Sequence, residues 1–599
     1  MTKPIIIHYI CTRIPQASKP TARFNATTKT KISKTSVMKK ALGLTVATAA
    51  MIVVSGCSKK MNQFSADYFN CNPNPLEVVG TQVPATVTGN VPAKFFVKNA
   101  TVTVTPVLVY GNYQTSGTPV KYQGEKVRGN DPVVSYDLGG SVVIPANFAY
   151  TPEMIKSELY LEFNVEQGKK QYVLPRVKVA DGVIATAAFA NAGTVDPAIA
   201  PDKFQRIINE KYSADIRFLI NQANIRPGEL KTAQMEAFNN DLKAAHADTS
   251  RVIRELNISS YASPDGSLEF NTQLAERRED NTATYLEKQL KKDMITEFGE
   301  LTAQFTPEDW EGFQKLVAAS DIQDKQLILS VLSMYKDPEQ REREIRNLAN
   351  VFEALADEIL PQLRYSRITA SVDVIGKSDA EINHLFDTDP SKLTVDELLY
   401  AATLTEKPAR KEAIYTAATR LYPNDFRGFN NLGMVKYEMG DYAAAKACFA
   451  QAQKLAPNAP EVQMNLGLID LLNSNYDAAN RYFGNAAGLN ELGDALGVYY
   501  LKKGDAAAAV KAFGNSKTNN AALAQILAKD YSKAKSTLAA IATPDATTYY
   551  LMAVVGARTN NSQVLTASLR QAIKLDPSMA QRAAQDLEFS KFNLSGVLN

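Results

Sequence analysis

The stretch Tyr261-Ala-Ser-Pro-Asp-Gly-Ser-Leu-Glu-Phe-Asn-Thr-Gln-Leu-Ala-Glu-Arg-Arg278 decides how the middle of this 599-residue chain is interpreted. It joins a turn rich in Ser, Pro, Asp and Gly to a helix that we expect to extend from Gly266 to about Leu290. The preceding residues Leu256-Asn-Ile-Ser-Ser-Tyr261 are typical of a strand. A turn between a strand and a helix places polar side chains at one end of a sheet, where a ligand could bind.

The residues before this stretch repeat the same alternation. Phe218-Leu-Ile-Asn-Gln-Ala-Asn-Ile-Arg-Pro227 predicts a strand followed by a turn. Pro227 is suited to the first turn of a helix, which we expect to continue to about His246. The predicted order is therefore strand, helix, strand, helix.

The spacing in this stretch resembles that of OmpA-like C-terminal domains, which bind the bacterial cell wall. The residues that carry the resemblance are Gly266, Asn271, Leu274 and Arg278. In that family the Arg pairs with an Asp three residues before the Gly, and together they hold the diaminopimelate of peptidoglycan. A guanidinium can grip a carboxylate through two hydrogen bonds, which suits such a role. The resemblance implies a peptidoglycan-binding site formed by Ser263, Asp265, Gly266, Asn271 and Arg278.

Ser263 departs from the family pattern, because it stands where the family has its Asp. A hydroxyl is a neutral acceptor, and a charged hydrogen bond is about twice as strong as a neutral one. Asp265 can substitute only if the turn brings it to the same point. Two interpretations stay open: contact with peptidoglycan, or an OmpA-like fold kept as a structural or protein-docking unit.

The last strand expected for this domain, Ile368 to Gly376, follows only after a long gap. Residues 291–362 have helical patterns, with a helix start at Thr306-Pro-Glu-Asp-Trp310. We therefore predict an OmpA-like domain over residues 205–385 with a helical insertion at about 291–362.

From residue 390 to 599 the sequence repeats with a period near 34 residues. This resembles the tetratricopeptide repeat, and about five or six helix pairs fit. The residues predicted to form the repeat core are Leu432, Gly433, Ala445, Phe449, Leu466, Gly467, Ala479 and Phe483. Such solenoids bind proteins or peptides along their concave face. Asn430, Asn431, Lys436 and Asn465 are expected near that face, with ordinary solvent-facing polarity as the alternative.

Residues 76–200 consist of short runs of β-branched and aromatic residues interrupted by Gly and Pro. The run Ala100-Thr-Val-Thr-Val-Thr-Pro-Val-Leu-Val-Tyr110 is typical of them, with alternating polar and apolar positions. This pattern predicts antiparallel strands and an all-β sandwich. No site chemistry stands out in this part of the sequence.

The first 56 residues have the features of a lipoprotein signal. Met38-Lys-Lys40 is a short positive region, residues 41–54 are apolar, and Val54-Ser-Gly-Cys57 ends in a cysteine. The resemblance to bacterial lipoproteins implies a start at Met38, removal of residues 1–56, acylation of Cys57 and a linker over residues 57–75. A mitochondrial transit peptide is the other interpretation of residues 1–37, which are basic and rich in Ser and Thr.

The sequence after Cys57 bears on the location of the chain, which looks like a lipoprotein of the Bacteroidota. Ser58-Lys59-Lys60 contains no acidic cluster of the kind that sends such proteins to the cell surface, which favours the periplasmic face of the outer membrane. Residues 1–56 hold nine Lys and Arg and no acid, so without them the formal net charge changes from +3 to −6. Nucleic-acid binding therefore loses its support.

No catalytic or metal-binding motif stands out. His246 and His384 do not have metal-ligand spacing, and phosphate-binding loops and nucleophile elbows are missing from the sequence. We expect a non-catalytic protein without cofactor or metal. One hypothesis is an outer-membrane lipoprotein that tethers peptidoglycan and recruits protein partners through its repeats. The other is an accessory subunit of an outer-membrane assembly or secretion machine, in which the OmpA-like domain is mainly a docking element.

Overall fold

The N-terminal part of the described chain is rich in β-sheet. The computed structural model describes residues 60–322, 325–347 and 353–598, and the predicted signal segment and Cys57 lie outside them. A three-stranded sheet has the order β1-β3-β8, and a second sheet has the order β10-β9-β4-β6-β7 with β5 paired to β4. The strands are β1 (Phe69–Asn72), β2 (Leu76–Glu77), β3 (Gln82–Val91), β4 (Ala100–Tyr110), β5 (Tyr113–Ser116), β6 (Val120–Gly124), β7 (Val133–Val134), β8 (Gly140–Ala149), β9 (Ser157–Gln167), β10 (Lys170–Asp181) and β11 (Val183–Ile184). Side chains from both sheets share one apolar core.

This sheet-rich part begins earlier than predicted, because most of the expected linker is folded into it. Met61 and Phe64 are buried, and the Phe64 ring stacks on Phe163 at 4.3 Å between centroids. Cys71 lies buried in β1, which pairs with β3. Residues 58–74 are mostly polar apart from a few apolar residues such as these, which is why the sequence pattern predicted a linker. At the other end, the chain leaves the sandwich core after Ala188, although we predicted the sandwich to extend to residue 200.

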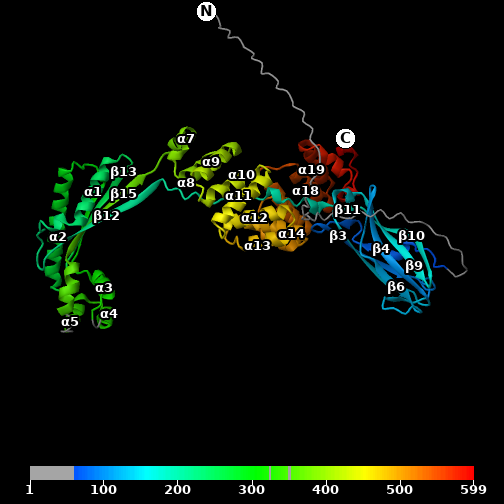
Figure 1. Cartoon of the computed structure of the whole chain (residues 1–599), viewed down its shortest axis with the longest axis horizontal. Helices are drawn as coiled ribbons and strands as arrows, with labels where there is room; N and C mark the ends of the chain where they lie inside the picture. Colours follow the sequence, from blue (N-terminus) through cyan, green and yellow to red (C-terminus); the bar gives the residue numbers. More distant parts are fainter. Residues whose placement is uncertain (1–59, 323–324, 348–352, 599) are drawn as a thin grey trace, which may run out of the picture. The chain divides into compact units, whose positions relative to one another are not determined.

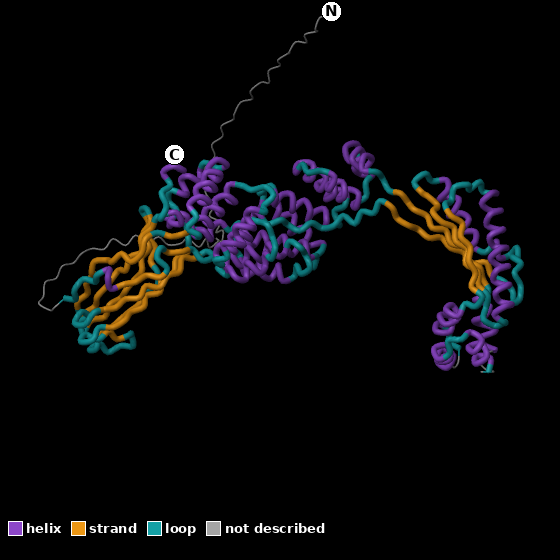
Figure 2. The backbone as a smooth tube through the Cα atoms, turned by 180° about the vertical axis from the view of Figure 1, so that it is seen from behind, coloured by secondary structure: helices purple, strands orange, loops and turns teal. Residues whose placement is uncertain are grey.

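The middle of the chain forms a mixed four-stranded sheet of order β12-β15-β13-β14. Its strands are β12 (Ile207–Arg217), β13 (Arg251–Tyr261), β14 (Glu300–Thr306) and β15 (Tyr365–Ile375), and its helices are α1 (Ala233–Ala247) and α2 (Leu268–Lys292). β13 and β14 are parallel, whereas β15 is antiparallel to both β12 and β13. Apolar side chains of both helices pack on the sheet, and Figure 2 shows a long helix lying along the orange strands.

Three details of this domain differ from the prediction. The helix expected from Pro227 begins at Ala233, where the Thr232 side chain caps it. Residues 218–227 form a loop rather than a strand, and the strand lies earlier, in β12. β14 lies inside the region that we predicted to be a helical insertion. Its residues Glu-Leu-Thr-Ala-Gln-Phe-Thr alternate between polar and apolar, a strand signal that the helical interpretation of residues 291–362 overlooked, and they form an edge strand with no buried side chain. The insertion therefore follows Thr306, with α3 (Trp310–Ala319), α4 (Lys325–Met334) and α5 (Pro338–Arg346).

The C-terminal part is all-helical and built from successive helix pairs (Figure 1). Its helices are α7 (Asp379–Thr388), α8 (Val395–Ala401), α9 (Pro408–Leu421), α10 (Phe426–Glu438), α11 (Tyr442–Leu455), α12 (Pro460–Leu472), α13 (Tyr476–Gly484), α14 (Leu492–Lys503), α15 (Ala506–Phe513), α16 (Asn519–Leu527), α17 (Tyr531–Ala539), α18 (Ala546–Arg558), α19 (Ser562–Leu575), α20 (Ser578–Ala583) and α21 (Ser595–Leu598). Each pair packs on the next, with one apolar core over α7 to α10 and a second from α10 to α21.

The pairs are held by a small residue facing an aromatic one. Phe449 and Phe483 are buried, and they lie against Gly433 and Gly467 of the preceding helices. A Cβ added to Gly467 would lie 2.6 Å from the Phe483 ring. Ala445 and Ala479 are fully buried, Leu466 is nearly so, and Leu432 is half-buried. The two helices of each pair can therefore approach this closely only because glycine has no side chain.

Gly467→Ala is expected to destabilise the repeats by about 1–3 kcal/mol, because the new methyl group overpacks the Phe483 ring. Gly484→Ala is the matched control. A Cβ at Gly484 meets nothing within 4 Å in α13, so this change should stabilise by up to about 1 kcal/mol through helix propensity. Thermal unfolding followed by the helical circular-dichroism signal measures both. Equal midpoints for the two variants would contradict the packing argument.

Candidate functional site

The predicted ligand-binding turn between β13 and α2 is occupied by a side chain of the same domain. The Asp265 carboxylate accepts from the Ser263 hydroxyl at 2.6 Å and from Nη2 of Arg364 at 2.9 Å. Arg364, which directly precedes β15, also donates from Nε to Ser263 Oγ at 3.1 Å. Arg346 of α5 donates to the Asp265 backbone carbonyl. The groups expected to receive the ammonium of a ligand are thus already paired with guanidinium groups.

Arg278 is placed differently from the expectation. Its side chain is fully buried, and its nitrogens donate to the backbone carbonyls of Leu219, Tyr261 and Gln222 at 3.3, 2.8 and 3.0 Å. Burial, and then the neighbouring Arg364, lowers the pKa of Arg278 to about 10. The predicted grip on a ligand carboxylate is therefore replaced by a structural role. The guanidinium ties the loop after β12 to the end of β13, because the loop covers this side of α2.

The five candidate residues do come together around one turn. Asn271 is 2% exposed, and its Nδ2 donates to the Gly266 carbonyl at 3.0 Å. A Cβ added to Gly266 would lie 3.0 Å from Asn271 Oδ1, which leaves no space for a ligand between them. The side chains of Ser263, Asp265 and Asn271 are thus already engaged in hydrogen bonds within the domain.

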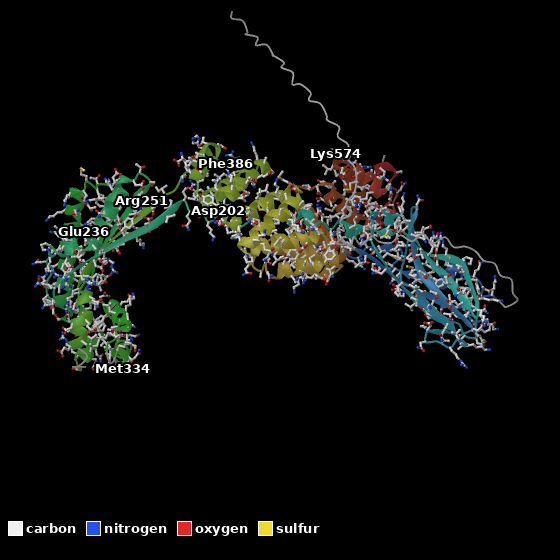
Figure 3. The ribbon with its side chains drawn as sticks, viewed as in Figure 1. Asp202, Glu236, Arg251, Met334, Phe386 and Lys574 are labelled. Carbon is white, nitrogen blue, oxygen red and sulfur yellow. The ribbon has the colours of Figure 1, made fainter. Side chains whose placement is uncertain are left out.

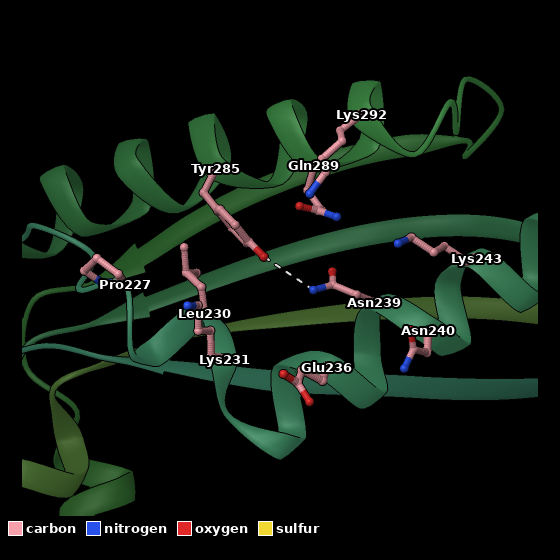
Figure 4. A pocket seen from close by; sticks show the side chains of 10 residues that line it. All are labelled: Pro227, Leu230, Lys231, Glu236, Asn239, Asn240, Lys243, Tyr285, Gln289 and Lys292. Carbon is pink, nitrogen blue, oxygen red and sulfur yellow. Dashed lines mark hydrogen bonds between the residues drawn. The ribbon is translucent and has the colours of Figure 1, made fainter.

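A different hollow lies between α1 and α2, with a cavity volume of about 490 Å³ (Figure 4). Its lining residues are Pro227, Leu230, Lys231, Glu236, Asn239, Asn240, Lys243, Tyr285, Gln289 and Lys292. Asn239 Nδ2 lies 3.5 Å from the Tyr285 hydroxyl, and Lys243 pairs with Asp293 at 3.1 Å. Sequence reasoning did not identify this hollow, because its residues are spread over the turn before α1 and two ordinary amphipathic helices.

The main binding feature of the molecule is a groove of the helical repeats that is filled by the chain's own residues 185–204, here called the groove segment. Its path along the helices can be followed in teal in Figure 2. Three asparagines hold its backbone. Asn520 accepts from the Asn191 N–H at 2.9 Å and donates to the Asn191 carbonyl at 2.8 Å. One amide side chain therefore satisfies both polar groups of one segment residue.

Asn465 and Asn431 repeat this arrangement further along. Asn465 pairs with the N–H and carbonyl of Ala198 at 2.7 and 2.8 Å, and Asn431 pairs with those of Ala200 at 2.8 and 2.9 Å. Asn430 adds a bond of 3.0 Å to the Ala198 carbonyl. Asn430, Asn431 and Asn465 are at most 1% exposed. Their predicted position on the ligand-facing side is thus occupied, and the ligand is the chain itself.

Further contacts hold the segment between and beyond these asparagines. The Tyr437 hydroxyl donates to the Ala192 carbonyl at 2.7 Å, and burial raises the pKa of Tyr437, so the phenol stays a donor. Arg427 Nη1 donates to the carbonyl of Asp202, a residue labelled in Figure 3, at 2.8 Å. Lys436, the fourth residue expected on this face, instead pairs with Glu412 at 2.7 Å.

Aromatic contacts mark the two ends of the segment. Phe189 lies 5.1 Å from the Tyr550 ring of α18, with Arg582 at 3.8 Å over its face. Phe204 stacks on Tyr400 of α8 at 4.3 Å. The segment therefore runs from the last repeats to the first, opposite to the order in which the repeats follow along the chain.

The periodicity of the repeats signals two of these asparagines. Asn431 and Asn465 are 34 residues apart and occupy the same position in α10 and α12. Asn520 escapes this pattern because the units between residues 487 and 540 are shorter. Among the described residues, no group of three or more His, Cys, Asp or Glu side chains is placed to hold a metal ion. In the same part of the chain, every helix is too short or too polar to cross a membrane.

Comparison with known proteins identifies the repeats. Residues 426–459 match the sequence profile of the tetratricopeptide repeat family. No curated protein matches the chain. This match confirms the predicted repeat type, and repeats of this kind indicate protein partners.

Solved structures of tetratricopeptide proteins are similar to part of the chain. One, from Parabacteroides merdae, is 12% identical with a TM-score of 0.28, over 35% of this chain and 91% of its own. Another, pilF of Pseudomonas aeruginosa, is 14% identical with a TM-score of 0.27, over 36% and 98%. YrrB, described as having an unusual peptide-binding site, is 21% identical with a TM-score of 0.22, over 28% and 97%.

Proposed function

We propose that this protein is a non-catalytic scaffold, anchored by an acylated Cys57 in the outer membrane and facing the periplasm. Its repeats serve protein partners, and the domain of residues 205–385 is an OmpA-like unit used mainly for docking. The succession of strand, helix, strand, helix and strand supports the OmpA-like assignment. Of the two hypotheses, this is the accessory subunit of an outer-membrane assembly or secretion machine.

One observation carries the choice between the accessory subunit and the wall tether. The Asp265 carboxylate is paired with Arg364, and Arg278 is fully buried and donates from each of its three nitrogens to a backbone carbonyl. Binding diaminopimelate would require breaking a part-buried pair, which leaves a charge without its partner. A peptidoglycan ligand would therefore have to compete with the domain's own structure.

The test is purification of the full chain from membranes with and without lysozyme digestion of the wall. The accessory-subunit role predicts that the same outer-membrane barrel protein co-purifies in both conditions. It also predicts that Cys57→Ser abolishes incorporation of labelled fatty acid and releases the protein from the membrane. Loss of the partner after lysozyme treatment would contradict the proposal.

Sedimentation with purified peptidoglycan tests the wall tether directly. We expect no retention of the wild type at physiological salt. The informative variant is Asp265→Asn, which removes the carboxylate but keeps the shape of the side chain. Retention of the wild type that Asp265→Asn abolishes, with unchanged fluorescence of Trp310, would restore the tether.

A further inference from the structure

The groove segment is held through its backbone at three positions and through apolar side chains between them, since Ala192, Val195 and Ala198 belong to the apolar core of the repeats. The groove therefore recognises a backbone conformation together with small apolar side chains. Asn520, Asn465 and Asn431 each pair with the N–H and carbonyl of one residue. These bonds require an extended backbone at the clamped positions and are indifferent to side-chain chemistry. Any chain that presents its backbone in the same way can make them.

The space around the segment limits the side chains that fit. Ala198 and Ala200 are each 1% exposed, and a Cβ added to Gly193 would lie 2.4 Å from the Tyr442 hydroxyl. Ile199, between the two clamped alanines, is 43% exposed and points away from the clamps. A ligand of this groove therefore needs small residues at the two positions held by Asn465 and Asn431 and tolerates a large one between them.

The segment is tethered at both ends, by β11, which ends at Ile184, and by β12, which begins at Ile207. A tethered ligand competes with a free one at an effective concentration in the millimolar range. A partner peptide with the same contacts would therefore be excluded from the groove until the segment leaves it.

We propose that residues 185–204 are a resident ligand that closes the groove, and that a protein partner enters only after their release, with an extended backbone and small residues at the positions held by Asn465 and Asn431. This inference rests on the proposed scaffold function, since it names the chemistry of the partner and the device that controls its access. The backbone of the partner then forms the hydrogen bonds with the asparagine side chains that the resident segment formed before its release.

The probe is a fluorescent synthetic peptide with the sequence of residues 185–204, added to the full chain and followed by anisotropy. Ala198→Glu in the chain places a charged side chain in the buried clamp, so the resident segment should leave while the groove stays intact. The peptide is expected to bind this variant at least about 100-fold more tightly than the wild type. Ile199→Glu is the matched control: it adds the same charge one residue away, on an exposed side chain, and should bind as weakly as the wild type.

A second variant tests the groove itself. Ala198→Glu combined with Asn465→Ala should lose the binding gained by Ala198→Glu, because the amide that pairs with the peptide is gone. Equal binding by the wild type and Ala198→Glu would overturn the proposal. So would the absence of binding to an Ala198→Glu chain that keeps the helical signal and thermal transition of the wild type.

Hydrogen exchange of the wild type keeps the proposal testable if Ala198→Glu does not fold. The amides of Ala198 and Ala200 should exchange through a local opening that is more frequent than exchange of the repeat core. Exchange of these amides only with global unfolding would make the segment a permanent strut and overturn the proposal. Neither measurement involves the membrane partner, so failed co-purification would reject the scaffold function and leave this result standing.

Discussion

Arg278→Ala is expected to lower the free energy of unfolding of the domain of residues 207–375 by about 3–5 kcal/mol. The change leaves the carbonyls of Leu219, Tyr261 and Gln222 without their donor and opens a cavity under the loop after β12. Removing a buried charge returns part of its desolvation energy, so the net effect is smaller than the sum of the lost bonds.

The measurement is a urea titration followed by the fluorescence of Trp310, the only Trp in the sequence, which lines a small apolar pocket with Pro264 of the turn. Arg277→Ala is the matched control, because its side chain is exposed on the same helix, and its midpoint should be unchanged. An Arg278→Ala protein as stable as the wild type would contradict the structural role. If Arg278→Ala destabilises the domain, a loss of peptidoglycan binding in this variant can be caused by unfolding. Its stability must therefore be measured together with its binding.

Asn465→Asp is expected to destabilise the repeats by about 3 kcal/mol or more at neutral pH. It replaces the amide nitrogen that donates to the Ala198 carbonyl at 2.8 Å and to Asn430 Oδ1 at 3.0 Å with an oxygen. Two hydrogen bonds then become contacts between acceptors, and the introduced charge is buried at a side chain that is 0% exposed.

The loss should depend on pH in a defined direction. Burial among acceptors raises the pKa of the introduced carboxyl above its unfolded value of about 4, so the folded state binds the extra proton. Stability therefore falls as pH rises above that unfolded value, and part of it returns on acidification. Thermal melts at pH 5 and pH 7.5 measure this. Asn490→Asp, at an exposed loop residue, should change neither midpoint, and identical pH profiles for the two variants would refute the clamp.

The sequence predicted features that rest on local signals. α2 begins where the turn ends, with the Ser267 side chain accepting from the Phe270 N–H as its cap. The small and aromatic positions of the repeats lie in contact, as with Gly467 and Phe483, because the 34-residue spacing reflects the geometry of one helix pair.

Features that depend on contacts between residues far apart in the chain could not be predicted from the sequence. The spacing from Gly266 to Arg278 brought the candidate residues to one turn, but nothing in it indicates that Arg364, almost a hundred residues after the turn, pairs with Asp265. Asn431 and Asn465 carry a visible period, yet their partners at residues 198 and 200 lie in a run of small residues without periodicity. Such pairings depend on the three-dimensional path of the chain, which local propensity does not encode.

The direction of the groove segment has a consequence for the order in which the protein matures. Ala198 and its clamp Asn465 are separated by 267 positions, and Asn191 and Asn520 by 329. A nascent chain grows at about 5–20 residues per second. The groove segment is therefore synthesised tens of seconds, or longer, before the helices that enclose it. It can therefore reach its clamped position only after α12 and α16 have been made, although it is synthesised long before them.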